Sequence, residues 1–525
     1  MCGILGLYGK FKGNDILSMM KIIEKRGTDA HGVYLENDET TFFDNDIDMD
    51  TFNDDNEYNV GFGHNLLSIS NFYNEDNLLN LQPKKLNNLV LSFNGEIYNY
   101  KEVLDFLKSN LYDGEAPKSD CDLLMQVLNY YYNKNQDLLE AVQYTNRRID
   151  GDYVYAIYDG ENIALSRDSV GVKPLFYGEN DTIRGFASER KALWKVGITD
   201  VKTLEPGHIL YNYEDIEPKY LIYDYESNKN HKYETYIKYL DEYINDSVKN
   251  RIANIDNIGL VFSGGVDSTL LLYYILDNLE DNQTLKLYTV GNENSQDLKF
   301  ARRIAEDLDL PLCETIITED IVREFLDDTL LAIEEPNLMK LGVGMTTYIA
   351  TNMIHEDGIK VALSGQGADE LFAGYKRYLN TYEEGYKDTD GLFYKRFRAV
   401  EHELRQDIAH IHDVNLERDD ATSMANTVEL RVPYLSDKII KWVLNIPAKY
   451  KINGSADNIR KNILRELAVK KGVPEDVAYR KKKAAQYGSG IDKFLRRKIF
   501  RGVNINKYFD ELVDSYIGEW FYYVG

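Results

Sequence analysis

An apolar strand that runs into a glycine-rich turn and then a helix constrains this chain more than any other segment. The strand is Ile258 to Phe262, the turn is Ser263 to Ser268 (Ser-Gly-Gly-Val-Asp-Ser), and a helix is expected to start near Thr269. Two glycines let the backbone turn tightly and approach a ligand. Free N–H groups and the helix N-terminus then bind an anion such as phosphate. The alternative, an ordinary glycine turn, is disfavoured by this strand–turn–helix context.

Strands and helices alternate around this turn. Apolar runs at 285–290 and 360–363 predict two more strands. Residues 297–308 predict a helix, because their apolar side chains recur on one helical face. This alternation implies an α/β domain with a parallel sheet, and the pattern beyond about residue 390 is mostly helical.

The first ~210 residues show a different pattern, with short β-type runs separated by Gly, Asn and Asp and few helices. Residues 213–235 are polar and rich in Tyr, which predicts a linker. We therefore expect an α+β domain over residues 2–212, a linker over 213–235 and the α/β domain over 236–525.

Charge and composition exclude several classes of partner. The chain has 525 residues and a net charge of −26, which argues against nucleic acid or an anionic membrane as the main partner. No apolar run approaches the ~18 residues of a membrane span, and the N-terminus lacks the basic segment of a signal peptide. Three cysteines are too few for a disulfide scaffold, so a reducing, cytoplasmic compartment is expected.

Residues 36–57 carry ten acidic side chains and no Lys or Arg. Asp44, Asp46, Asp48 and Asp50 alternate as in a calcium-binding loop. However, Met49 stands where such a loop needs Gly, and Asp55 where it needs a bidentate Glu. A solvated acidic loop is the simpler interpretation.

Cys2 is a candidate nucleophile. Removal of the initiator Met would leave Cys2 with a free α-amine beside its thiol, and an amine of pKa ~8 can serve as a base there. A lone cysteine is more often a small buried hydrophobic residue, so Cys2 alone leaves both interpretations open.

Several segments resemble known families. The Ser263–Thr269 turn resembles the pyrophosphate loop of the N-type ATP pyrophosphatases, which cleave ATP to AMP and pyrophosphate while adenylating a substrate. Residues 364–375 (Ser-Gly-Gln-Gly-Ala-Asp-Glu-Leu-Phe-Ala-Gly-Tyr), 418–420, 423–425 and 429–435 resemble blocks of the glutamine-hydrolysing asparagine synthetases. Residues 26–29, 94–99, 119–120, 150–152, 167–175 and 187–189 resemble the class II glutamine amidotransferase domain. This resemblance implies an N-terminal nucleophile-type αββα fold for the first domain.

The resemblance implies a glutamine site in the first domain. Cys2 would attack the glutamine amide, while Asn94 and the N–H of Gly95 would stabilise the oxyanion. Asp120, with Glu96, would recognise the α-amino group. The other glutamine-binding positions implied are Leu66, Leu67, Ser68, Ile69 and Ser70. An Asn-Gly pair also favours a type I′ hairpin turn, which is a second interpretation of 94–95.

It also implies an ATP site in the second domain. Asp267 and Asp369 would bind Mg²⁺, which neutralises phosphate oxygens. The residues expected to bind ATP are Val261, Ser263, Gly264, Gly265, Val266, Asp267, Ser268, Val290, Ser364 and Gly365. Arg480 to Gly488 resembles the segment with the catalytic lysine; Lys482 aligns with that lysine and Lys483 is the near alternative. A solvated basic turn is the other interpretation of this segment.

Two positions depart from the family pattern. Leu66 stands where the family usually has the Arg that holds the α-carboxylate of glutamine, and losing such a clamp typically matters by a few kcal/mol. Gln366, in the segment linked to acyl-adenylate formation, replaces a Glu of well-known members. These changes leave open the acceptor carboxylate and the choice between glutamine and ammonia.

The function implied is ATP-dependent amide synthesis. Glutamine hydrolysis at Cys2 would supply ammonia to an adenylated carboxylate, with aspartate converted to asparagine and AMP and pyrophosphate released. The alternatives are a different carboxylate acceptor, a preference for free ammonia, or a degenerate member of the family. The resemblance also implies a homodimer.

Overall fold

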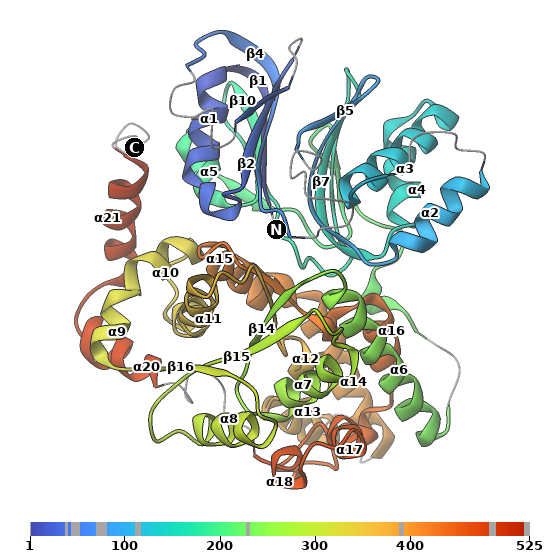
Figure 1. Ribbon diagram of the computed structural model, residues 1–525, viewed down its shortest axis with the longest axis vertical. Coiled ribbons are helices and arrows are strands. Elements are labelled where there is room, and N and C mark those ends of the chain that lie inside the picture. The colour runs from blue at the N-terminus through green and yellow to red at the C-terminus, as the bar shows by residue number, and fades with distance from the viewer. Residues whose placement is uncertain are drawn as a thin grey trace.

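The computed structural model describes residues 2–36, 40–43, 53–69, 81–110, 117–226, 231–387, 393–481 and 490–518. Ser70, Lys482 and Lys483 lie outside this part of the chain, as do Asp44, Asp46, Asp48 and Asp50. Figure 1 shows the N-terminal part above the C-terminal part, with two sheets side by side in the upper half and a third sheet among helices below.

The N-terminal part contains two antiparallel sheets. The first has the strand order β11-β9-β10-β1-β4-β2-β3, and the second has β13-β12-β8-β7-β6-β5. The strands are β1 (Gly3–Lys12), β2 (Ala30–Leu35), β3 (Thr41–Phe43), β4 (Glu57–Leu66), β5 (Lys84–Leu86), β6 (Leu89–Ile97), β7 (Gly151–Tyr158), β8 (Ile163–Arg167), β9 (Phe176–Glu179), β10 (Ile183–Ala187), β11 (Val201–Thr203), β12 (Ile209–Tyr211) and β13 (Glu214–Ile216).

Helices cover the outer face of each sheet. They are α1 (Gly13–Ile22) and α5 (Arg190–Lys195) on the first sheet, and α2 (Tyr100–Ser109), α3 (Asp120–Asn135) and α4 (Leu138–Asn146) on the second. In β1 the side chains alternate, so Leu5 and Leu7 pack against the helices while Ile4 packs between the sheets. The predicted four-layer αββα fold is therefore confirmed.

The C-terminal part is built on a five-stranded parallel sheet, as predicted, with the order β16-β15-β14-β17-β18. Its strands are β14 (Asn257–Val261), β15 (Thr284–Gly291), β16 (Leu312–Ile316), β17 (Val361–Leu363) and β18 (Glu429–Arg431). The helices before residue 390 are α6 (Tyr233–Ile252), α7 (Val266–Asn278), α8 (Gln296–Asp307), α9 (Glu319–Glu324), α10 (Leu326–Ile333), α11 (Leu338–Glu356), α12 (Ala368–Leu371) and α13 (Arg377–Lys387).

The region beyond residue 390 is mostly helical, as expected. It contains α14 (Phe393–Ala409), α15 (Glu417–Met424), α16 (Asp437–Leu444), α17 (Asn462–Lys470), α18 (Glu475–Ala478), α20 (Ile491–Phe494) and α21 (Ile505–Ile517). The pattern did not predict β18, because only its middle residue is apolar. It is nevertheless fully buried beside β17.

The start of one helix and the structure of the expected linker differ from what the sequence predicted. Helix α7 begins at Val266 after Gly265, three residues earlier than Thr269, so Asp267 lies in the first helical turn. The segment 213–235 contains β13, which pairs with β12, and Ile222, which packs into the C-terminal core.

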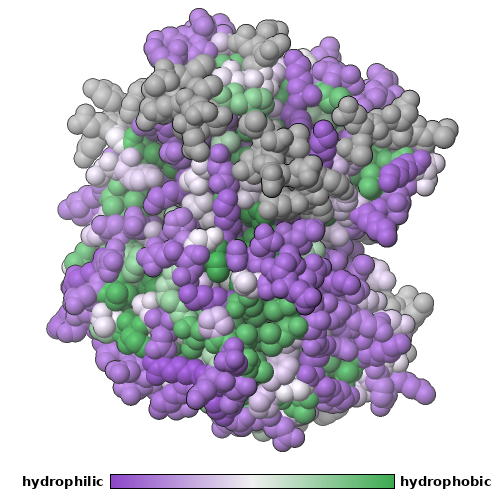
Figure 2. Space-filling model, in the orientation of Figure 1, coloured by the Kyte–Doolittle hydropathy of each residue, from purple (hydrophilic) through white to green (hydrophobic). Residues whose placement is uncertain are grey.

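The last helix returns to the N-terminal part. Figure 1 shows α21 rising beside α5, where Phe509 meets Trp194 edge to face and Lys195 Nζ donates to the Ile517 carbonyl at 2.8 Å. Figure 2 shows hydrophilic side chains over most of one face, with apolar ones gathered in its lower half. Among the helices described, none is long and apolar enough to cross a membrane.

Candidate functional site

Cys2 lies at the start of β1, in a pocket at the end of the two N-terminal sheets. The thiol-bearing residue is buried, and its backbone N–H donates to Asn94 Oδ1 at 2.9 Å. Burial raises the pKa of the Cys2 thiol, while a backbone hydrogen bond from Leu67 opposes this effect. The pocket is lined by Cys2, Leu66, Leu67, Ser68, Ile69, Gln82, Phe93, Gly95, Glu96, Ser119, Asp120 and Cys121. The glutamine-binding positions predicted from sequence therefore line this pocket, with two exceptions. Asn94 is not a lining residue but bonds to Cys2, and Ser70 lies outside the described residues.

Asn94 and Gly95 do not form a hairpin turn. Both lie inside β6, paired with Val154 and Tyr153 of β7, so that interpretation is wrong. A Cβ on Gly95 would lie 2.4 Å from the Asp152 carbonyl oxygen, which explains the glycine. Within the described residues, Asn94 Nδ2 is buried and makes no hydrogen bond. An amide donor in this state is available to an oxyanion formed next to Cys2.

Two carboxylates face the same pocket. Asp120 Oδ2 accepts from Ile97 N at 2.8 Å, and burial raises the pKa of Asp120 well above its usual range, with Glu96 as the next cause. Burial also raises the pKa of Glu96, against the attraction of Arg431, 3.0 Å away. An ammonium group bound between these carboxylates would favour their charged forms.

Leu66 makes one wall of the pocket apolar. It packs with Cys2, Ala30 and Leu81. None of the pocket-lining residues in the described part of the chain is Lys, Arg or His. The side chain expected to hold the α-carboxylate of glutamine is therefore absent from the position that the family pattern predicts.

A larger cavity of about 420 Å³ lies at the carboxyl ends of β14 and β17, a common ligand position in parallel sheets. Its lining includes Ser263, Gly265, Val266, Asp267, Gln366 and Asp369. Two other predicted ATP residues, Ser268 and Gly365, lie next to residues that line this cavity. Ser268 Oγ lies 3.2 Å from Ser263 Oγ, and a Cβ on Gly365 would be 3.2 Å from that of Asp267. Gly264 has a φ of +62°, which a glycine adopts without strain.

Val261, Val290 and Ser364 are not among the lining residues of the cavity. The two valines are partly buried in the core beneath the sheet. Ser364 N donates to the Arg431 carbonyl at 2.9 Å, which continues the register of β17 against β18.

A buried lysine joins the two predicted Mg²⁺ ligands. Lys461 Nζ lies 2.8 Å from both carboxylate oxygens of Asp267 and 2.7 Å from Asp369 Oδ1. The two carboxylates therefore converge on one cation. Two carboxylates suit Mg²⁺, which takes its other ligands from water and phosphate. The described residues contain no cluster of three or more His, Cys, Asp and Glu side chains suited to a metal ion.

Four arginines line the same cavity: Arg377, Arg418, Arg465 and Arg480. Arg480 is paired with Asp297 at 2.9 Å and stands two residues before Lys482. The basic segment that follows Arg480 therefore starts at the cavity. Lys482 and Lys483 themselves lie outside the described residues, so the choice between them stays a prediction.

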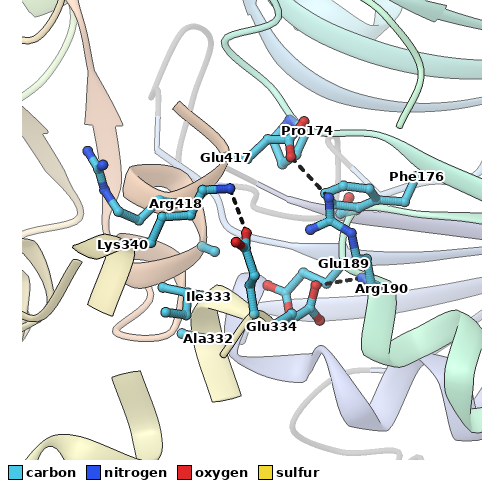
Figure 3. A pocket seen from close by; sticks show the side chains of 13 residues that line it. Pro174, Phe176, Glu189, Arg190, Ala332, Ile333, Glu334, Lys340, Glu417 and Arg418 are labelled. Carbon is cyan, nitrogen blue, oxygen red and sulfur yellow. Dashed lines mark hydrogen bonds and ion pairs between the residues drawn. The ribbon is translucent and has the colours of Figure 1, made fainter. Parts of the chain in front are cut away.

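The N-terminal and C-terminal parts meet through buried charges. Figure 3 shows a smaller cavity at this interface, where Arg190 Nη2 lies 3.2 Å from Glu417 Oε2 and Arg190 N donates to Glu334 Oε2 at 2.8 Å. Arg431 connects the pocket around Cys2 with the backbone near the larger cavity. Its side chain pairs with Glu96 and its backbone bonds to Ser364.

Sequence reasoning missed Lys461 and the position of Arg431. Arg431 belongs to the segment 429–435 that carries the family resemblance, but its pairing partner is far away in sequence. Lys461 stands in no segment that we singled out, and its φ of +54° places it at the start of α17. Only the fold brings it to the two aspartates.

Comparisons with known proteins agree with this arrangement. The family model for asparagine synthase matches residues 239–504, and that for the glutamine amidotransferase domain matches 48–211. The chain is 36% identical to the putative asparagine synthetase [glutamine-hydrolyzing] 1 of Methanocaldococcus jannaschii, over 99% of this chain and 100% of that protein. It is 27% identical to the human asparagine synthetase [glutamine-hydrolyzing], over 93% of this chain and 84% of the relative.

Proposed function

Because the chain belongs to the asparagine synthase family, we propose that it carries out glutamine-dependent, ATP-driven amide synthesis, with aspartate as the acceptor and asparagine as the product. The observation that carries the proposal is the linked pair of pockets, one around Cys2 and one around the Ser263–Ser268 turn. We propose residues 2–212 as the glutaminase domain, 213–235 as the connection and 236–525 as the synthetase domain.

In the first pocket, the Cys2 sulfur attacks the amide carbon of glutamine. The α-amine that Cys2 gains when the initiator Met is removed accepts the thiol proton and passes it to the leaving ammonia. Asn94 Nδ2, buried and without a hydrogen bond among the described residues, and Gly95 N–H stabilise the oxyanion. Water then cleaves the thioester to glutamate. Asp120 and Glu96 bind the α-amine of the substrate, while Leu66 to Ile69 form the opposite wall.

In the second pocket, a carboxylate oxygen of the acceptor attacks the α-phosphorus of ATP, and pyrophosphate leaves. The N–H groups of 263–268 and the N-terminus of α7 hold the departing phosphates. Asp267 and Asp369 would hold Mg²⁺, which when bound neutralises phosphate oxygens. Lys461 Nζ pairs with the same two carboxylates, so some of its ion-pair contacts must break when the metal binds.

Ammonia then attacks the carbonyl carbon of the acyl-adenylate, and AMP leaves. We propose that Lys482 stabilises the charge on the phosphate during adenylation, because it follows by two residues Arg480, which lines the cavity. Gln366 lies in the same cavity, where its neutral amide contacts the acceptor without serving as a base. A reducing compartment, the cytoplasm, suits an enzyme that needs Cys2 as a free thiol.

A different carboxylate acceptor is the second candidate, and Gln366 is the observation that favours it. The test is release of pyrophosphate and AMP with ATP and Mg²⁺, comparing aspartate with other carboxylates and glutamine with ammonium. We expect AMP formation that depends on aspartate, and Cys2→Ala should abolish use of glutamine but not of ammonium. AMP formation with another carboxylate and none with aspartate would assign the second candidate.

A further inference from the structure

The pocket around Cys2 poses an electrostatic problem for an α-amino acid. Glutamine brings a carboxylate as well as an amine, yet Glu96 and Asp120 line the pocket and none of the lining residues that the structure describes is cationic. The chain that follows Ile69, residues 70–80, contains no Lys, Arg or His in its sequence either. A carboxylate bound here needs a cation from just outside the lining residues.

Lys84 stands next to this pocket. It begins β5, two residues after Gln82, which lines the pocket. Lys84 is paired across the sheet with Leu91, whose side chain packs in the core beneath α3. Because opposite residues of an antiparallel pair share a face, the Lys84 side chain lies on the α3 side.

The contacts of Lys84 lead back to the pocket. Its Nζ pairs with Asp122 Oδ1 on α3, directly after the lining residues Asp120 and Cys121. Burial raises the pKa of the Cys121 thiol to about 12. The positive charge of Lys84 is the largest of the influences that lower this pKa. The positive charge is therefore felt at a group that lines the pocket.

Asp122 has favourable contacts besides the one with Lys84. Asp122 also accepts from Lys118 N at 3.0 Å and lies in the first turn of α3, where backbone N–H groups favour a carboxylate. Lysine carries its charge on a flexible four-carbon stem, so its Nζ can move from one carboxylate to another. The side chain of Lys84 is 24% exposed.

Other cations close to the pocket are already held by acidic side chains. Lys360 Nζ donates to the Ser68 carbonyl at 3.2 Å and to both carboxylate oxygens of Asp29 at 2.9 and 2.7 Å. Arg431 pairs with Glu96 and Glu429 at 3.0 and 2.9 Å. Arg26 donates to the Cys2 carbonyl and pairs with Glu189 and Asp420 at 3.0 and 2.9 Å. Both guanidinium groups are at most 2% exposed. Removing either from its partners would leave buried charges unpaired, which is costly.

We propose that Lys84 is a specificity-determining residue that binds the α-carboxylate of glutamine and so compensates for Leu66. This rests on the proposed glutaminase function. Lys84 does not take part in the chemistry at Cys2, and its effect is on the binding of an amide donor that carries an α-carboxylate.

The test compares two amide donors on the full-length chain by steady-state kinetics. Glutamine carries the α-carboxylate, whereas 4-aminobutanamide retains the amide and the amine and lacks it. We expect Lys84→Met to raise the KM for glutamine by about tenfold to a hundredfold, as for one charge-assisted hydrogen bond. It should leave kcat/KM for 4-aminobutanamide unchanged. Lys85→Met is the matched control, because Lys85 lies over the Tyr34 ring, and it should leave both values unchanged.

A second variant keeps the proposal falsifiable if Lys84→Met lowers stability. Adding Leu66→Arg to Lys84→Met should restore the low KM for glutamine by placing a cation on the opposite wall. An unchanged KM in Lys84→Met, or an equal loss with 4-aminobutanamide, would overturn the proposal. Ammonium-dependent synthesis reports on the proposed function separately. A wild-type chain that uses ammonium but not glutamine would refute the role of Lys84 and retain the synthetase.

Discussion

Glu96 and Arg431 form an ion pair of 3.0 Å that joins the two halves of the molecule. Glu96 lies in β6 and lines the pocket around Cys2, while Arg431 ends β18 of the parallel sheet. The Arg431 carbonyl accepts from Ser364 N, in the loop that leads to Gln366. One residue therefore contacts both the proposed glutamine site and the backbone of the proposed ATP site.

Breaking this pair should be strongly destabilising. Arg431→Met removes the cation that pairs with the buried Glu96 and one of the cations near Glu429, so we expect a loss of about 3–5 kcal/mol in the free energy of unfolding. Adding Glu96→Gln to Arg431→Met should recover part of that loss, because one unpaired charge disappears. Urea denaturation of the two single variants and the double variant measures the coupling energy. Strictly additive effects would mean that the pair contributes no coupling.

Asn94 should matter for glutamine hydrolysis and not for synthesis from ammonium. Asn94→Ala removes the amide donor proposed for the oxyanion, so we expect kcat for glutamate release to fall about 10²–10³-fold. The KM for glutamine should change much less, and AMP formation with ammonium should continue. Asn88, an exposed asparagine before β6, gives the control Asn88→Ala, which should leave both activities intact. Loss of both activities in Asn94→Ala would point to a folding defect instead.

Removal of Lys461 should make stability dependent on Mg²⁺. Lys461→Met leaves Asp267 and Asp369 facing each other without the lysine, which should lower the melting temperature. A divalent cation that binds the two carboxylates stabilises the folded state by mass action. We expect millimolar MgCl₂ to recover part of the loss in the variant, compared with NaCl at equal ionic strength.

The matched control for that experiment is Lys471→Met, which breaks a pair with the exposed Asp277. Its melting temperature should respond to MgCl₂ as the wild type does. If Lys461→Met melts at the same temperature with either salt, Asp267 and Asp369 do not hold a divalent cation in the absence of ATP.

His64 should make the fold sensitive to mild acid. Its ring is fully buried, and burial lowers the pKa of His64 to about 3, below the usual 6.5. The unfolded chain therefore binds a proton at pH values where the folded chain does not. Stability contributed by the neutral ring is present above pH 6.5 and falls by about 1.4 kcal/mol per pH unit between 6.5 and 3.

Urea titrations at pH 7.5 and 5.5 measure this effect. His64→Gln should reduce the pH dependence of the free energy of unfolding by close to one proton. His355→Gln, which alters an exposed ring at the end of α11, should leave the slope unchanged. Equal slopes in wild type and His64→Gln would show that another group causes the acid sensitivity.

Substitutions of Lys482 and of Lys483 should differ in their effect on adenylation. We expect Lys482→Ala to abolish ATP–pyrophosphate exchange dependent on the acceptor, while glutamate release from glutamine persists. Lys483→Ala is the matched control and should retain exchange. The opposite pattern would move the catalytic role to Lys483, and exchange in both variants would remove it from this segment.

Much of the fold could be predicted because periodicity is a local property. The strands near 258, 285 and 361 and the helix near 297 lie within a residue or two of their expected bounds. Helix α7 begins earlier than expected because Gly265 serves as its N-cap. Strand β18 was missed because it is three residues long and its burial comes from its neighbours. Asn94-Gly95 is typical of a turn in isolation, but pairing along the whole of β6 overrides that preference.

The sequence by itself determined the family, the nucleophile candidate Cys2 and the phosphate-binding turn, because each depends on residues adjacent in the chain. Only the tertiary structure decided which charges meet. Lys461 contacts Asp369 and also Asp267, which is 194 residues away in the sequence. Arg431 pairs with Glu96, which lies in a different sheet. Burial then sets their strength, since a charge removed from water must find its partner within a few ångströms. The cation proposed to bind the α-carboxylate, Lys84, is likewise brought next to the pocket by the pairing of β5 with β6.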